Sequence, residues 1–362
     1  MAHDTVGVEV AGVEAGGWVD RLAPEAAAAW RRSGAEAAAV VDARMLGLCR
    51  LRVVELLGDR ADGDRRRAEA VAGGLDPGEV AVVSQWYRAD AFGPAERAAL
   101  AFTEQFVADV SSVSPRETAP LLEALGPEGC YAFISALFVA EFSERLALSV
   151  ERVLGASATA GAAVPSSTPR PAVRTAGADH RDLRLPLPAG AAKPSARAAA
   201  YAPGVHAALS DFQAAAVRLD AVDAVVGELV RLRCARHHDC RVCRTLRLDG
   251  ARREGVDEAM LAKLDVYDDS DLPERAKAAL RFTDAFITVP TLIDAGLRDE
   301  LVAAYRPAEI VELALDIMKF STQKILVSLG LDIPPEQTDE LGVAYFDFGP
   351  DGRPAWFSAV AP

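Results

Sequence analysis

The feature that most constrains the fold is an internal repeat. The segment Ala98–Phe106 reads Ala-Ala-Leu-Ala-Phe-Thr-Glu-Gln-Phe, and the segment Ala278–Phe286 reads Ala-Ala-Leu-Arg-Phe-Thr-Asp-Ala-Phe. At the same spacing, Pro127 matches Pro307, and each proline stands at the start of an apolar segment. Self-similarity at a fixed spacing indicates repeated structural units. We therefore expect two copies of one domain in this chain.

Apolar side chains recur in both halves at the spacing of amphipathic helices. Between Pro94 and Val110, for example, Leu100, Phe102 and Phe106 fall along one side. Alanine is the strongest helix former and is abundant, while hydrophobic residues make up 51% of the chain and aromatic residues 6%. The pattern predicts an all-α protein, built as a duplicated helical bundle with two pseudo-equivalent domains.

Changes in composition predict the domain boundaries. Residues 155–200 are dominated by Ala, Pro, Ser, Thr and Gly, which is typical of a linker. We expect the first domain to occupy residues 1–154 and the second to occupy residues 201–335. The tail, residues 336–362, contains an aromatic segment around Tyr345 and is expected to cover either a pocket mouth or a neighbouring subunit.

The charge of the chain excludes two classes of partner. The formal net charge is −14, whereas nucleic acids and anionic membrane surfaces need a basic footprint. The longest apolar run, residues 130–142, is too short to span a bilayer. No basic region followed by an apolar run marks the N-terminus, and the cysteine count of five is odd. We therefore expect a protein of the reducing cytoplasm that makes no contact with membranes.

The segment richest in reactive side chains contains a Cys-x-x-Cys motif, Cys240 and Cys243. Helical spacing predicts a helix from Cys240 to Arg253, with the motif at its start. The positive end of the helix dipole then favours thiolate over thiol, and cysteines three residues apart can form a disulfide. Nearby arginines add positive potential that lowers the thiol pKa: Arg241, Arg244 and Arg247.

Less specific interpretations of these residues stay open. The cysteines can be an inert relic or bind a metal ion with His237 or His238, although that spacing is not a common zinc motif. Glu228 stands twelve residues before Cys240 and is either part of the site or a solvated surface residue. The remaining cysteines lie in apolar helical runs and are expected to be buried in the core: Cys49, Cys130 and Cys234.

Aligning the two halves shows that only the second carries the reactive groups. Gly47 and the aspartates at positions 59 and 62 match Glu228, Cys240 and Cys243. The first copy therefore keeps the helical pattern but lacks the reactive side chains. We expect it to support the second copy by packing or by forming part of a pocket.

The second half resembles the AhpD-like alkylhydroperoxidase and carboxymuconolactone decarboxylase family. The resemblance lies in Glu228-Leu-Val-x-Leu-Arg233, Cys240-x-x-Cys243, Gly255 and the helix Ala278–Phe286. It covers most of residues 201–330, and a weaker version covers about 20–154. The resemblance implies an all-helical fold that assembles into trimers or hexamers. For a chain with two such domains, it implies a trimer.

The resemblance also implies roles for individual residues. Cys243 attacks a hydroperoxide, Cys240 resolves the product, and an external dithiol recycles the pair without a bound cofactor or metal. In the family, a glutamate at the position of Glu228 and a histidine four residues after the second cysteine relay protons. Arg247 stands at that histidine's position here and cannot shuttle a proton near neutral pH. His237 is a candidate replacement.

Three functions follow from the sequence. The first is a cytoplasmic thiol-dependent oxidoreductase that reduces hydroperoxides through Cys240 and Cys243. The second is a non-redox enzyme of the decarboxylase-like branch, which acts on a small carboxylate or lactone held by arginines. The third is a non-catalytic helical assembly module. Thiol reactivity separates the first function from the other two.

Overall fold

A computed structural model describes residues 13–58, 60–155, 182–336, 338–339 and 342–356. The described chain is mainly helical, which confirms the helical character expected from its composition and apolar spacing. None of the described helices is both long and apolar enough to cross a membrane.

The described residues of the first half form helices and the turns that connect them. These elements are α1 (Val13–Leu22), α2 (Pro24–Val40), α3 (Ala43–Leu57), α4 (Arg60–Ala72), α5 (Pro77–Val82), η1 (Val83–Gln85), α6 (Pro94–Ala108), η2 (Val110–Ser112) and α7 (Pro115–Leu154).

The second half contains further helices and three short strands. Its helices are α8 (Pro194–Ala199), α9 (Pro203–Val217), α10 (Ala224–His237), α11 (Arg241–Thr245), α12 (Asp249–Arg253), α13 (Glu258–Ala262), η3 (Lys263–Asp265), η4 (Tyr267–Asp269), α14 (Glu274–Thr288), η5 (Pro290–Leu292), α15 (Ala295–Ala304), α16 (Pro307–Ser321) and α17 (Lys324–Leu329). Its strands are β1 (Leu246–Leu248), β2 (Ala344–Phe348) and β3 (Pro354–Trp356).

Local signals set the helix boundaries that the sequence predicts. Helix α6 begins at Pro94 and buries Phe102 and Phe106 completely, as its apolar spacing indicates. The helix ends before Asp109, which leaves the helical conformation and whose side chain caps the following short helix η2. Within α7, Gly126 has φ 66°, so the helix is kinked just before the apolar segment that starts at Pro127.

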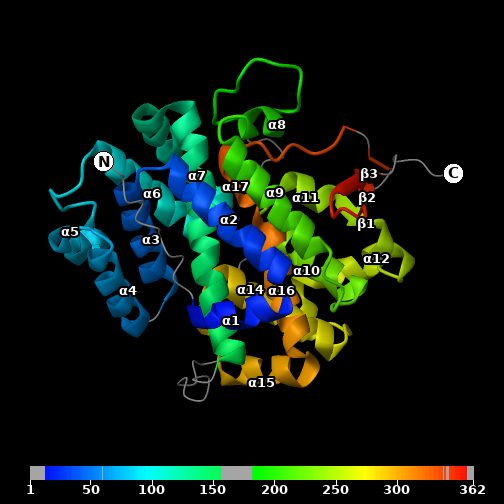
Figure 1. The fold of residues 1–362 in the computed structure, drawn as a ribbon. Coiled ribbons are helices and arrows are strands. Elements are labelled where there is room, and N and C mark those ends of the chain that lie inside the picture. Colours follow the sequence, from blue (N-terminus) through cyan, green and yellow to red (C-terminus); the bar gives the residue numbers. More distant parts are fainter. Residues whose placement is uncertain (1–12, 59, 156–181, 337, 340–341, 357–362) are drawn as a thin grey trace.

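Helix α7 lies at the centre of the molecule and joins the two halves (Figure 1). It packs against α2, α3 and α6 of the first half and against α14 and α16 of the second. Helices α2 and α9 lie side by side across it. The hydrophobic core is therefore continuous between the halves.

The predicted helix from Cys240 to Arg253 is wrong in its middle. Helix α11 ends at Thr245, and the next three residues form β1, which pairs in parallel with β2 from the tail. Strand β2 pairs antiparallel with β3, so the tail completes a three-stranded sheet. In β1, the backbone N–H and C=O groups bond to a distant strand instead of to residues of the same helix. The local spacing of apolar residues does not reveal such a distant partner.

Part of the predicted linker packs on the second half. Residues 156–181 lie outside the described chain. Beyond them, the backbone N–H of Arg184 donates to the carbonyl of Leu329 at 3.0 Å, and Leu185 is buried. Helix α8 follows and buries Ala198 and Ala199. Residues 182–200 are thus part of the second half's packed structure.

Candidate active site around a disulfide

The turn between α10 and α11 places the Cys-x-x-Cys motif. After α10 ends at His237, Asp239 adopts φ 48°, a left-handed conformation that aspartate tolerates better than most residues. The backbone N–H of Cys240 then donates to the carbonyl of Ala235 at 2.9 Å. This turn ends α10 and makes Cys240 the N-cap residue of a new helix, α11.

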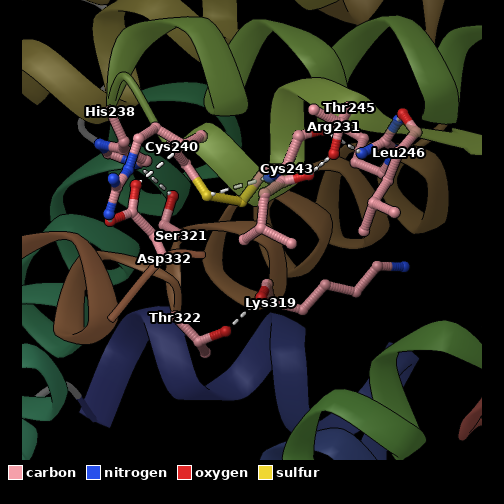
Figure 2. The surroundings of a disulfide bond; sticks show 12 residues. Arg231, His238, Cys240, Cys243, Thr245, Leu246, Lys319, Ser321, Thr322 and Asp332 are labelled. Atoms are coloured by element: carbon pink, nitrogen blue, oxygen red, sulfur yellow. Dashed lines mark hydrogen bonds and ion pairs between the residues drawn. A yellow bond between two sulfur atoms is a disulfide. The ribbon is translucent and has the colours of Figure 1, made fainter. Parts of the chain in front are cut away.

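Cys240 and Cys243 form a disulfide, with their Cα atoms 5.3 Å apart (Figure 2). The backbone N–H of Cys243 also donates to Sγ of Cys240 at 3.2 Å. Cys240 is fully buried, whereas Cys243 is only partly buried and lines a cavity of about 900 Å³. The two sulfur atoms therefore differ in access, and Cys243 is the one that meets a molecule in the cavity.

A buried ion pair fixes the backbone around the disulfide. Both carboxylate oxygens of Glu228 accept hydrogen bonds from Arg231, at 2.6 and 2.7 Å. Arg231 also donates to the carbonyls of Cys243 and Leu246 (Figure 2). Glu228 further accepts from the backbone N–H of Leu248 at 3.2 Å. One buried pair thus holds both α11 and β1 in place.

This arrangement predicts a large effect of Arg231→Lys. A lysine cannot bind the carboxylate in a bidentate manner and reach two carbonyls as well. We expect the free energy of unfolding to fall by about 2 kcal/mol or more, because buried acceptors lose their donors. Urea denaturation measures the change.

The matched control for this prediction is Arg252→Lys, which is expected to change stability by less than about 0.5 kcal/mol. The side chain of Arg252 is exposed and donates to Oδ1 of Asp249 within its own short helix, α12. Equal losses in the two variants would contradict the clamping role assigned to Arg231.

The arginines expected to lower the thiol pKa are each paired with a carboxylate. Arg241 pairs with the buried Asp332, both through its side chain and through its backbone N–H. The other two pairs are Arg244 with Asp239 and Arg247 with Glu258. Their charges are largely neutralised, which weakens the electrostatic effect predicted from the sequence.

The two histidines before the motif lie in different surroundings. His238 is buried, and its Nε2 lies 2.9 Å from Oγ of Ser321, beside Cys240 in Figure 2. His237 does not line the cavity, and its buried Nε2 has no hydrogen-bond partner in the described chain. Burial lowers the pKa of His237 to about 4, so this imidazole is neutral at pH 7. Across the described residues, no group of three or more His, Cys, Asp or Glu side chains is arranged to hold a metal ion.

The other three cysteines lie in the core, as the sequence predicts. Cys49, Cys130 and Cys234 are fully buried and free of disulfides. Burial raises the pKa of Cys49 and of Cys130 to about 12 and that of Cys234 further still. Their thiols remain protonated at neutral pH and are poor nucleophiles.

The tail forms one wall of the cavity, which agrees with the first of its two expected roles. Phe346 and Phe348 of β2 line the cavity, and Arg231 lies under the ring of Phe346, with its guanidinium carbon 5.7 Å from the ring centre. Gly352 has φ 73°, and a side chain there would collide with the carbonyl of Ala214 in α9. The tail therefore lies directly on the second half.

Helix α16 forms another part of the wall and carries buried charges. Lys319 lines the cavity, and its Nζ lies 2.6 Å from a carboxylate oxygen of Asp316. Glu312, one turn before Asp316, is also buried and accepts a hydrogen bond from the backbone N–H of Ala221 at 2.7 Å. Burial and the neighbouring Asp316 raise the pKa of Glu312 to about 7.

The raised pKa of Glu312 predicts a pH-dependent stability. Between about pH 4.5 and pH 7 the folded protein binds more protons at Glu312 than the unfolded chain does, so stability falls as pH rises through this window. We expect Glu312→Gln to be more stable than the parent by about 2 kcal/mol above pH 7 and to lose this advantage below pH 4.5. Urea denaturation at both pH values tests this. An advantage that is independent of pH would contradict it.

Arg231 is the residue of this site that the sequence interpretation missed. It occupies the variable position of Glu228-Leu-Val-x-Leu, yet it contacts the backbone of both α11 and β1. Its spacing of three residues from Glu228 on a helix was the available signal, because such residues share one face. Nothing in the sequence indicated that this pair is buried.

No protein-family model matches the chain. It is similar to two proteins of Mycobacterium tuberculosis, Uncharacterized protein Rv2313c of strain ATCC 25618 / H37Rv and Uncharacterized protein MT2376 of strain CDC 1551 / Oshkosh. Each is 32% identical over 263 residues, which cover 72% of this chain and 80% of the relative. The names of both relatives state no activity.

Proposed function

Because the chain belongs to the same family as these two mycobacterial proteins, whose names leave the reaction open, we propose its function from the site: a thiol-dependent oxidoreductase of the AhpD-like type that reduces organic hydroperoxides. One observation carries this proposal. Cys243 lines a large cavity, while Cys240 is completely buried within bonding distance of it. An accessible attacking sulfur beside a buried resolving sulfur is the arrangement that dithiol peroxide reduction needs.

The reaction begins with the reduced dithiol. The Cys243 thiolate attacks the terminal oxygen of R–O–O–H, the O–O bond breaks, and the alkoxide takes a proton to leave as R–OH. Cys243 is then a sulfenic acid. The Cys240 thiolate attacks its sulfur, the S–S bond forms, and the hydroxide leaves as water after protonation. The dithiol has lost two electrons, which an external dithiol restores by thiol–disulfide exchange.

The surroundings give Glu228 and Arg231 a positioning role in this proposal. Glu228 accepts three hydrogen bonds from Arg231 and Leu248, so its carboxylate is committed to the local structure. Arg247 is paired with Glu258 and is not among the described residues that line the cavity. Protons for the leaving groups then come from solvent that enters the cavity.

The order of elements supports the proposed duplication. The succession α6, η2 and the kinked α7 parallels α14, η5, α15 and α16 of the second half. In the first half, Gly47 stands at the position that matches Glu228. A side chain at Gly47 would contact the side chain of Leu75, which already fills this space. We propose that the first half supports the second, and that three chains assemble as a cytoplasmic trimer. Light scattering of the purified protein measures the chain number.

Mass spectrometry of the reduced protein tests the proposed function. One equivalent of an organic hydroperoxide should convert the Cys240 and Cys243 thiols to a disulfide, with loss of two hydrogens. The double variant Cys240→Ser and Cys243→Ser should keep its mass. Thiols that survive excess hydroperoxide would exclude this reaction and favour a non-redox enzyme or an assembly module.

A further inference from the structure

A second cavity adjoins the one that Cys243 lines. It has a volume of about 290 Å³ and lies between α7 of the first half and α8, α9 and α17 of the second. The two cavities share part of their walls, since Ser195, Ser210, Gln213, Gln323 and Leu326 line both. A sufficiently long molecule bound beside Cys243 can therefore reach these shared residues and the second cavity.

The walls of the second cavity are uncharged and carry several polar side chains among apolar ones. The described residues that line it include no Asp, Glu, Lys or Arg. Burial raises the pKa of the Tyr131 phenol to about 12 and lowers that of His206, so both are neutral at pH 7. By contrast, Lys319 and Arg353 line the first cavity. An uncharged wall that carries some polar side chains favours a neutral hydrogen-bonding group over an ion, because it offers no counter-charge for a desolvated ion.

Gln323 stands at the junction of the two cavities with its amide available. It lies between α16 and α17 and lines both cavities, and its side chain forms no hydrogen bond with the rest of the described chain. The neighbouring Gln213 differs, because its Nε2 already donates to Oγ1 of Thr322 and to the carbonyl of Lys319. Gln323 can therefore both donate to and accept from a ligand.

The first cavity offers an apolar surface between Cys243 and this junction. Val242 and Leu246 flank the disulfide, and Leu326 and Phe346 continue the wall. A volume of about 900 Å³ is also far larger than a small peroxide requires and lies in the range of sites for sizeable organic ligands.

We propose that the two cavities together bind an elongated organic molecule, with its reacting group at Cys243, an apolar body, and an uncharged hydrogen-bonding end that Gln323 recognises. The identity of the reacting group rests on the proposed function. Binding of the alcohol product needs no turnover, however, so it can be measured on the disulfide form of the protein.

Titration calorimetry of the oxidised full chain with three matched alcohols tests the proposal. The probes are octanol, an octanediol with hydroxyls at both ends, and hydroxyoctanoate, which carries a carboxylate at one end. We expect the diol to bind about five-fold more tightly than octanol, because one more hydrogen bond forms. Hydroxyoctanoate should bind more weakly than the diol, because its charge is not compensated in the second cavity.

Gln323→Met keeps the length of the side chain and removes the amide. This variant should bind the diol and octanol equally, whereas the matched control Gln85→Met, an exposed position in η1, should keep the five-fold preference. Equal binding of diol and octanol by the parent, or tighter binding of hydroxyoctanoate, would overturn the proposal. If the preference depends on Gln323 but hydroperoxide is not consumed, the ligand class stands and the proposed reaction fails.

Discussion

Replacing Cys243 by serine is expected to slow hydroperoxide reduction by at least about a thousand-fold, because this sulfur is the nucleophile of the proposed reaction. Cys240→Ser should instead permit one turnover and then stop with Cys243 as a sulfenic acid. The asymmetry follows from burial, since Cys243 lines the cavity and Cys240 is inaccessible. Rapid-mixing kinetics of the reduced proteins and trapping of the sulfenic acid with dimedone measure both effects.

The control for this pair is Cys49→Ser. Cys49 is fully buried in the first half, and burial raises its pKa to about 12, so its thiol takes no part in the reaction. This variant should reduce hydroperoxide at nearly the parent rate. A sulfenic acid that accumulates on Cys240 in Cys243→Ser would reverse the proposed order of attack.

Glu141→Gln is expected to lower the free energy of unfolding by about 3 to 5 kcal/mol, because it leaves buried cations without their counter-charge. Glu141 is fully buried on α7, where it pairs with Arg145 and with Lys324 of α17. Nζ of Lys324 lies 2.7 Å from both carboxylate oxygens. Arg145 extends the cluster to the carbonyl of Phe286 at the end of α14. Urea denaturation measures the loss.

The buried cluster links the two halves, so its loss should also change the urea unfolding transition of both halves. The double variant Glu141→Gln and Lys324→Met removes one cation together with the anion and should recover part of the stability. Glu258→Gln, which breaks a pair at a half-exposed carboxylate, should cost less than about 1 kcal/mol. A single variant at Glu141 that unfolds at the parent's urea midpoint would show that this cluster does not stabilise the fold.

Local sequence patterns predicted the elements whose causes are local. The apolar spacing from Pro94 onward predicted α6, and the match of Pro127 with Pro307 marked the start of the apolar part of α7. The same spacing failed for Leu246–Leu248, where it predicted continuation of a helix. That segment became a strand because it pairs with the tail, whose residues lie about a hundred positions further along the chain. Helical spacing alone does not contain that partner.

The sequence by itself determined that the chain is mainly helical and that Cys240 and Cys243 lie close enough to react with one another, because both depend on residues within a few positions. Only the tertiary structure decided which sulfur faces a cavity and that Arg231 holds the segment. It also decided that the tail closes one wall of that cavity. These properties arise from burial and from contacts between distant segments, which exist only once the helices have packed.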